Sequence, residues 1–190
     1  MAAKLSANAL IELAKNRRSI YTLSKNLPIS TQRITEISNR VVVLYGAEHD
    51  KLWDITADTL KAIVPAETWE GTSKRISGFK AAAGTVLFYV DNAAVEAMQT
   101  KFAIYADRFP PWAVQSAGIQ QYLLWTALEA EGLGANLQHY NPLIDEKVAE
   151  TWKIPSTWTL NAQLVFGAKT AEAAPKDYAP LEERVKVFGA

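Results

Sequence analysis

QYLLWTALEAEGLGANLQHYN, residues 121–141, is the most informative run of the sequence. Together with residues 115–120, it is apolar on nearly every side as far as Ala130, a pattern typical of a helix enclosed by other elements. The pattern therefore predicts a buried central helix over 115–130. Gly132 and Gly134 end this helix, as glycines of an ordinary C-cap do, and a short extended piece is expected over 135–140.

Helical and strand patterns alternate around this helix. Strands are expected over 41–45, 85–90 and 157–167, where β-branched and aromatic residues gather. Helical periodicity predicts helices over 6–18, 31–37, 46–65, 72–80 and 92–102, the last capped by Asn92, and a capped helix from Asp145. The alternation predicts a single α+β domain over residues 1–190, with one mixed sheet flanked by helices.

Three segments lack a helical pattern. Phe109-Pro-Pro-Trp112 is expected to form a rigid aromatic loop, because proline fixes φ and has no backbone N–H. Residues 169–180 are rich in Ala, Pro and charge, which is typical of an extended linker. Residues 184–188 alternate charged and apolar side chains, as an edge strand does.

Composition limits the possible functions. A chain of 190 residues with 49% hydrophobic and 21% charged residues has the make-up of one globular domain. Its formal net charge of zero argues against a dedicated nucleic-acid or membrane-surface binder. The absence of cysteine excludes disulfides, a thiolate nucleophile and Cys-based metal sites, and fits a reducing cytoplasm. We recognise no signal peptide and no apolar run long enough to span a bilayer.

The sequence contains few side chains suited to metal or acid–base chemistry. It has no Walker loop, no His-Glu-x-x-His and no complete Gly-x-Gly-x-x-Gly, and its two histidines are too few for a His-rich metal site. His49, between Glu48 and Asp50, is expected at the surface near the start of a helix. His139 is expected to make a structural hydrogen bond, and the alternative is that it lines a pocket.

Basic clusters lie near both ends of the chain. Arg17-Arg18-Ser19 follows the first helix. The two cations either complement the dipole of that helix or bind a phosphate or a carbonyl-bearing ring, with the Ser hydroxyl adding a hydrogen bond. Arg184 and Lys186 alternate on one face of the expected last strand, where protective charges of a solvated edge strand would also lie.

Two of these segments resemble the FMN-dependent nitroreductase family. Residues 13–21 (LAKNRRSIY) are similar to its N-terminal flavin-binding signature, in which a first helix ends in Arg-x-Ser. Residues 121–141 are similar to the central helix and Gly-Leu-Gly turn of the short branch found in fungi and some bacteria, and residues 158–167 resemble the strand that follows. The resemblance covers most of the chain, and its second segment is long enough to be specific.

The resemblance implies a nitroreductase-like α+β fold, an obligate homodimer, and an FMN held in a cleft at the dimer interface. The residues that it implies for FMN binding are Arg17, Arg18, Ser19, Tyr21, Leu133, Gly134, Ala135, Arg184 and Lys186. The N-terminal members would hold the phosphate, ribityl chain or pyrimidine edge, and the C-terminal basic pair would grip the phosphate. Gly134 and Ala135 would present backbone N–H groups to the isoalloxazine, where reduced flavin accumulates negative charge. Residues 169–190 would form a tail that reaches the partner subunit.

The implied function is an NAD(P)H oxidoreductase of the nitroreductase or quinone reductase type. It would use NADH or NADPH and pass hydride through flavin N5, by a ping-pong mechanism, to flat nitroaromatic or quinone acceptors, with no catalytic side chain. Phe109, Trp112 and His139 are candidates for the acceptor pocket, and core or dimer packing is the alternative role of the two aromatics. The alternative functions are a flavin-binding stress-regulatory protein with little turnover and a cofactor-free interaction module.

The sequence departs from the family between residues 37 and 40. The family has more helix there, and a Pro-Thr/Ser-x-x-Asn-x-Gln type segment whose Asn touches the flavin, whereas here Ile37 is followed directly by Ser38, Asn39 and Arg40. A strand begins only two or three residues after the expected helix, which is tight for a connection of ~2 to 6 residues. We therefore hypothesise that the sequence omits a mobile segment near residues 37–39.

Overall fold

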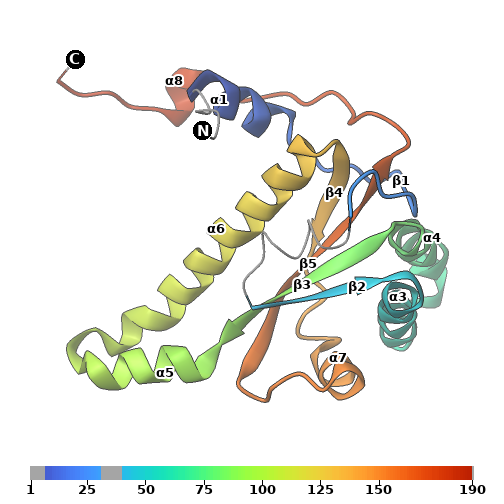
Figure 1. Cartoon of the computed structure of the whole chain (residues 1–190), viewed down its shortest axis with the longest axis horizontal. Helices are drawn as coiled ribbons and strands as arrows, with labels where there is room; N and C mark the ends of the chain where they lie inside the picture. Colours follow the sequence, from blue (N-terminus) through green and yellow to red (C-terminus); the bar gives the residue numbers. More distant parts are fainter. Residues whose placement is uncertain (1–6, 31–39, 190) are drawn as a thin grey trace.

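The computed structural model describes residues 7–30 and 40–189, and it contains one five-stranded sheet with helices on both sides (Figure 1). The helices are α1 (Ala7–Asn16), α3 (Gly46–Lys61), α4 (Trp69–Lys80), α5 (Asn92–Lys101), α6 (Phe109–Ala130), α7 (Asp145–Trp152) and α8 (Leu181–Arg184). Two 3-10 turns are η1 (Ala66–Thr68) and η2 (Ala103–Arg108). The strands are β1 (Leu23–Ser24), β2 (Val41–Tyr45), β3 (Gly84–Asp91), β4 (Leu133–Gln138) and β5 (Trp158–Lys169). The predicted α+β class is confirmed.

Strand β5 organises the sheet. It pairs with β1, β3 and β4, and β2 lies at the edge next to β3. All of these pairings, including β2 with β3, are antiparallel. Outside these strands, an isolated parallel bridge joins Ser19 and Ala135. The predicted strands over 41–45, 85–90 and 157–167 are confirmed.

The two faces of the sheet carry separate hydrophobic clusters. Successive residues of a strand point to opposite faces. Leu87 of β3 accordingly belongs to the cluster that contains Trp53 of α3, whereas its neighbour Phe88 belongs to the cluster that contains Leu124 of α6. Figure 1 shows α6 along one side of the sheet and α3, α4 and α7 on the other.

The central helix is the 22-residue α6, and the single chain covers only one side of it. Leu124 and Leu128 are buried against the sheet, whereas Ile119 and Leu123 are 71% and 58% exposed. The prediction of a helix buried all round is therefore wrong for the single chain, because one sheet face can cover only one side of a helix. No helix in the described part of the chain is both long and apolar enough to cross a membrane.

The segment Phe109-Pro-Pro-Trp112 forms the first turn of α6, so the predicted aromatic loop is wrong. Proline is tolerated there because the N–H groups of a first helical turn have no intrahelical acceptor. At the other end, Gly132 has φ +81° and follows directly after the C-cap residue Glu131. Glycine adopts this left-handed conformation without the strain that a Cβ would cause, so the expected end of the helix is confirmed.

The C-terminal residues do not form the predicted edge strand. Arg184 is the last residue of α8, and Lys186 lies in irregular backbone beyond it. Pro180 precedes this helix, and Glu182 and Glu183 in its first turn favour helix initiation. Five alternating residues are too few to specify a strand where no neighbouring strand pairs with them. The linker predicted over 169–180 begins one residue later, because Lys169 is the last residue of β5 and residues 170–180 contain no helix or strand.

Two helix caps also differ from the predictions. Asp91, rather than Asn92, caps α5, and its carboxylate accepts a hydrogen bond from the Ala93 N–H at 3.2 Å. Helix α7 begins at Asp145 without a side-chain cap. The helix predicted over 31–37, and the hypothesis of an omitted segment near 37–39, lie outside the described residues.

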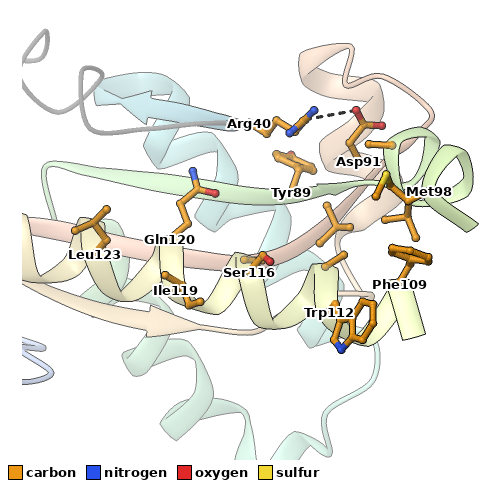
Figure 2. Close-up of a pocket in the computed structure, with 15 residues that line it drawn as sticks. Arg40, Tyr89, Asp91, Met98, Phe109, Trp112, Ser116, Ile119, Gln120 and Leu123 are labelled. Atoms are coloured by element: carbon orange, nitrogen blue, oxygen red, sulfur yellow. Dashed lines mark ion pairs between the residues drawn. The ribbon is translucent and has the colours of Figure 1, made fainter. Parts of the chain in front are cut away.

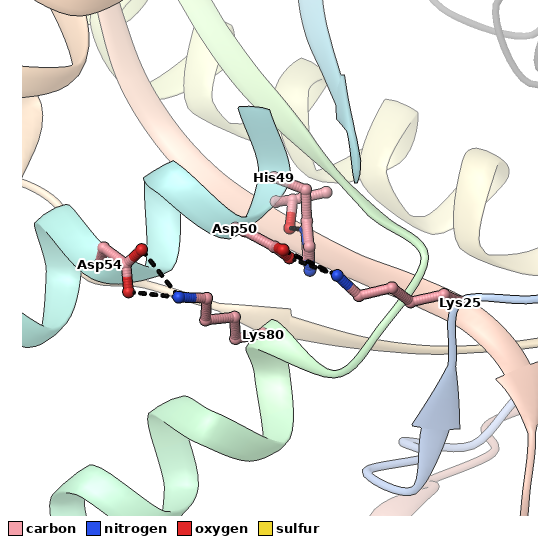
Figure 3. A network of polar contacts seen from close by, with 6 residues as sticks. Lys25, His49, Asp50, Asp54 and Lys80 are labelled. Carbon is pink, nitrogen blue, oxygen red and sulfur yellow. Dashed lines mark hydrogen bonds and ion pairs between the residues drawn. The ribbon is translucent and has the colours of Figure 1, made fainter. Parts of the chain in front are cut away.

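His49 is fully buried, which corrects its predicted surface position. Its Nδ1 lies 2.9 Å from Thr85 Oγ1, and this oxygen also accepts a hydrogen bond from Trp53 Nε1 at 3.1 Å. Figure 3 shows two ion pairs in this region, Asp50 with Lys25 and Asp54 with Lys80. Burial lowers the pKa of His49, since it disfavours the charged imidazolium.

Candidate functional site

The segment after α1 lies beside β4. The Ile20 N–H donates to the carbonyl oxygen of Ala135 at 2.9 Å, next to the parallel bridge at Ser19. Asn136 Nδ2 donates to the carbonyl oxygen of Ile20 at 2.8 Å, although the two residues are 116 positions apart. The structure thus brings together the basic motif at 17–19 and the segment after the central helix.

Gly134 is required for this close approach. A Cβ at position 134 would lie 2.8 Å from Leu23 Cδ2 and 2.9 Å from Ile20 Cβ, distances that real Cβ atoms avoid. The neighbouring Leu133 and Ala135 are buried. These side chains are therefore not available to a ligand, and the backbone contacts expected for Gly134 and Ala135 stay a prediction.

The two arginines of the basic motif have different surroundings. The Arg17 guanidinium carbon lies 4.2 Å from the ring centroid of Trp125 and 5.8 Å from that of Tyr122. The Arg17 Nε is buried and has no hydrogen-bond partner among the described residues. Arg18 Nη2 donates to the carbonyl oxygen of Ala174 at 2.7 Å, which ties the C-terminal tail to the end of α1. A buried charged donor without an acceptor is costly, so Arg17 is suited to bind an anionic group.

A hollow of about 530 Å³ includes Tyr21, two residues after this motif, in its wall. Its lining residues are Tyr21, Lys74, Arg75, Gly78, Phe79 and Gln138. We call it the cationic hollow, because α4 contributes Lys74 and Arg75 to it. Burial raises the pKa of the nearby Tyr140, and the positive charge of Arg75 opposes this shift. Sequence analysis missed Lys74 and Arg75, since an adjacent pair of cations is also what the solvated face of a helix contains.

The basic motif and the cationic hollow are close enough to share one ligand. Tyr21 is the fourth residue after Arg17, along non-helical backbone. Four residues span at most roughly 14 Å when fully extended. An elongated ligand with an anionic end could therefore contact the Arg17 guanidinium and also enter the hollow.

A second cavity, of about 570 Å³, lies between β3, α5 and α6, and we call it the aromatic cavity (Figure 2). The predicted pocket residues Phe109 and Trp112 both line it, and their rings are 5.4 Å apart in an edge-on arrangement. On another side Arg40 faces Asp91, with Nε 3.4 Å from Oδ2. The cavity combines an aromatic wall with one ion pair, a composition typical of small-molecule sites.

The remaining predicted site residues lie elsewhere. His139 is exposed and belongs to the lining of neither cavity. Arg184 and Lys186 are exposed in the tail, and Lys186 Nζ donates to the carbonyl oxygen of Glu182 at 2.7 Å. Within the described part of one chain, neither cation lines the cationic hollow.

Residues 14–168 match the sequence profile of the Nitroreductase family. The chain belongs to the nitroreductase family. A Saccharomyces cerevisiae nitroreductase-family relative, HBN1, is 37% identical over 189 residues, covering 90% of this chain and 93% of that protein. The solved structure of the nitroreductase CinD from Lactococcus lactis with nicotinic acid is 43% identical, with a TM-score of 0.86, and the match covers 94% of this chain and 99% of CinD. CinD has also been solved with 4-nitrophenol. Family membership indicates a flavoprotein oxidoreductase.

More distant structures share the fold of this family member. A nitroreductase with bound FMN from Desulfitobacterium hafniense is 13% identical, with a TM-score of 0.67, over 94% of this chain and 97% of that one. The nitroreductase NfnB from Mycobacterium smegmatis, in complex with NADPH, is 16% identical, with a TM-score of 0.70, over 96% of this chain and 99% of that one. At these identities the likeness concerns the fold alone.

Proposed function

We propose that this protein is an FMN-dependent NAD(P)H oxidoreductase that reduces flat nitroaromatic or quinone acceptors. The observation that carries the proposal is the Arg17 guanidinium, which stacks on Trp125 and whose buried Nε has no hydrogen-bond partner among the described residues. This donor set fits an elongated cofactor with a phosphate at one end and an electron-rich ring at the other. Family membership and the bound FMN of a structure with the same fold support the same cofactor.

The chain offers separate groups for the two ends of FMN. Arg17, with Arg18 and Ser19, would hold the phosphate or ribityl chain through charge-assisted hydrogen bonds. Lys74 and Arg75 in the cationic hollow would lie near the ring, where their charge favours the reduced state. Tyr21 forms part of the same wall.

When bound, FMN would supply the hydride chemistry, accepting hydride from NADH or NADPH at N5 and delivering it to the acceptor. The protein groups bind, orient and stabilise charge, so no side chain need act as a nucleophile. Donor and acceptor would occupy the same face in turn, which is the ping-pong order. The backbone N–H groups of Gly134 and Ala135 remain candidates for contacts with the ring.

The aromatic cavity is the candidate acceptor pocket of this enzyme. Phe109 and Trp112 offer ring surfaces to a flat ligand. The complexes of CinD with nicotinic acid and 4-nitrophenol support a small aromatic acceptor for a chain 42–43% identical to it.

A homodimer would bring these parts together. The outer side of α6 exposes Ile119 and Leu123, and the tail exposes Val187 and Phe188 at 71% and 91%. Large apolar side chains exposed together are typical of an association surface. We propose a C2 dimer in which the exposed side of α6 meets its copy and the tail reaches the partner, so that Arg184 and Lys186 complete a phosphate site there.

Steady-state kinetics test the proposed activity. We expect the wild-type protein, saturated with FMN, to consume NADPH or NADH when a quinone is supplied. The double variant Arg17→Ala, Arg18→Ala should require much more FMN, since each charge-assisted contact contributes about 1.5–3 kcal/mol. FMN binding without NAD(P)H consumption would favour the alternative, a flavin-binding stress-regulatory protein with little turnover.

A further inference from the structure

We propose that Trp125 is a positioning residue for the phosphate end of FMN: its indole face holds the Arg17 guanidinium in the orientation in which its terminal N–H groups meet the phosphate. The inference rests on the proposed function and adds a residue from the central helix to it. Trp125 has no place in the expected set of FMN-binding residues, and its effect would be exerted entirely through Arg17.

The geometry of the pair supports this role. The Arg17 guanidinium carbon is 4.2 Å from the Trp125 ring centroid, which is close for a cation–π contact, and 5.8 Å from that of Tyr122. Residues three positions apart on a helix face the same side, so the two rings form one aromatic surface on α6. Arg17 follows the last residue of α1 and lies against this surface.

Stacking leaves the hydrogen-bonding capacity of Arg17 intact. The five N–H donors of a guanidinium lie in its plane, whereas a cation–π contact uses its face. A stacked arginine can therefore still bind a phosphate with its edge. The Arg17 Nε is buried and has no partner among the described residues, so the phosphate would be bound by the terminal Nη groups.

A carboxylate on the same side of α6 is already neutralised. Glu129 lies four residues after Trp125, and its Oε1 is 2.7 Å from Lys169 Nζ. The Glu129 and Lys169 side chains are 9% and 23% exposed, so this pair is largely shielded from water. Because Lys169 neutralises the Glu129 carboxylate, Arg17 is not required as its counter-ion. The Arg17 guanidinium can therefore pair with an anionic ligand.

Holding Arg17 in place before binding improves affinity for a specific reason. A free arginine side chain has large rotamer entropy, which is lost when it grips a phosphate. An arginine side chain that is already stacked on Trp125 loses less rotamer entropy when it binds the phosphate. The Trp125 Nε1 is itself buried without a partner among the described residues, so the useful part of this side chain is its ring face. A phenylalanine should therefore replace it well, and an aliphatic side chain should not.

The test compares FMN with riboflavin, which has the same ring and ribityl chain but no phosphate. Both ligands are titrated into the wild-type protein and into the Trp125→Leu and Trp125→Phe variants, with flavin fluorescence as the readout. We expect Trp125→Leu to weaken FMN roughly 2- to 30-fold, the span of cation–π strengths, and to change riboflavin binding much less. Trp125→Phe should retain most of the FMN affinity.

A double-mutant cycle and a matched control complete the experiment. In the Arg17→Ala background, Trp125→Leu should have no further effect on FMN affinity, because its only route of action is gone. Trp152→Leu is the control. It removes a tryptophan of α7 whose ring has a cation–π contact with Lys51 of α3, at 6.0 Å from the ring centroid. The ratio of FMN affinity to riboflavin affinity in Trp152→Leu should equal the ratio in the wild type.

Two results would overturn the inference while the proposed function stands. One is an equal loss of FMN and riboflavin affinity in Trp125→Leu, which would reveal a packing role alone. The other is an undiminished effect of Trp125→Leu when Arg17 is already absent. Failure of the proposed function gives a different result, a wild-type protein that binds neither flavin.

Discussion

Gly134 of β4 and Ile20 of the N-terminal segment approach so closely that a Cβ on Gly134 would lie 2.9 Å from the Ile20 Cβ. This contact fixes the segment that follows Arg17 and Arg18 onto the strand that follows the central helix. The two parts of the sequence that resemble the family therefore form one structural unit. Its geometry depends on the lack of a side chain at position 134.

Gly134→Ala should consequently destabilise the protein. The added methyl group must displace Ile20 or Leu23, and such overpacking costs about 1–3 kcal/mol. Urea denaturation should show a lower midpoint with little change in slope. Gly71→Ala in α4 is the matched control, because a Cβ there meets nothing within 4 Å, and it should leave stability equal or slightly higher. Equal midpoints for Gly134→Ala and the wild type would show that the packing at β4 is loose.

Lys74→Ala and Arg75→Ala should each weaken FMN binding without unfolding the protein. Each removes a cation from the cationic hollow, and charge-assisted hydrogen bonds contribute about 1.5–3 kcal/mol. The loss corresponds to roughly 10- to 150-fold in the dissociation constant. Isothermal titration with FMN measures it, and Lys61→Ala at the end of α3 is the control. The assignment of the hollow fails if both variants bind FMN as the wild type does.

Mild acid should destabilise the fold through His49. Burial lowers the pKa of His49 in the folded protein, whereas the pKa in the unfolded chain is about 6.5. As pH falls below about 6.5, the unfolded state takes up a proton that the folded state resists, so the free energy of unfolding decreases. Stability is therefore fully present above this pH and is lost as pH falls toward the lowered pKa.

Thermal melts of His49→Gln between about pH 5 and 8 measure this effect. The variant should lose part of the pH dependence that the wild type shows below about pH 6.5. His139→Gln is the control, since His139 is the other histidine and is exposed. Identical pH profiles for His49→Gln and the wild type would mean that His49 takes up its proton normally in the fold.

Leu123→Glu should prevent association of two chains. Leu123 is 58% exposed on the outer side of α6 in the single chain, and the proposed dimer would bury it. A buried glutamate without a partner is strongly unfavourable. Light scattering at micromolar concentration should report a dimer for the wild type and a monomer for the variant. A monomeric wild type would count decisively against the proposed dimer.

The sequence predicts the elements of this fold well where the hydrophobic pattern is long. Periodicity identifies α3 and α6, and β-branched runs identify β2 and β3. The pattern fails where a few residues must be interpreted alone. Pro110 and Pro111 suggest a loop, yet a first helical turn accepts them equally well. Charged neighbours suggest that His49 is exposed, yet its own position faces Thr85.

The candidate site is only partly predictable for a related reason. Arg17 and Gly134 belong to contiguous motifs, so the sequence shows them directly. Lys74 and Arg75 of α4 line one hollow with Tyr21 and with Gln138 of β4, and no local sequence pattern predicts that these distant segments meet. The stacking of Arg17 on Trp125 likewise joins residues far apart in the chain.

Flavin binding by the purified protein tests the central claim most directly. The protein is purified, its visible absorption spectrum is recorded, and FMN is titrated into any flavin-free fraction while flavin fluorescence is followed. We expect the absorption of oxidised flavin, or saturable binding, at one FMN per chain. A colourless protein that leaves the fluorescence of added FMN unchanged would contradict it.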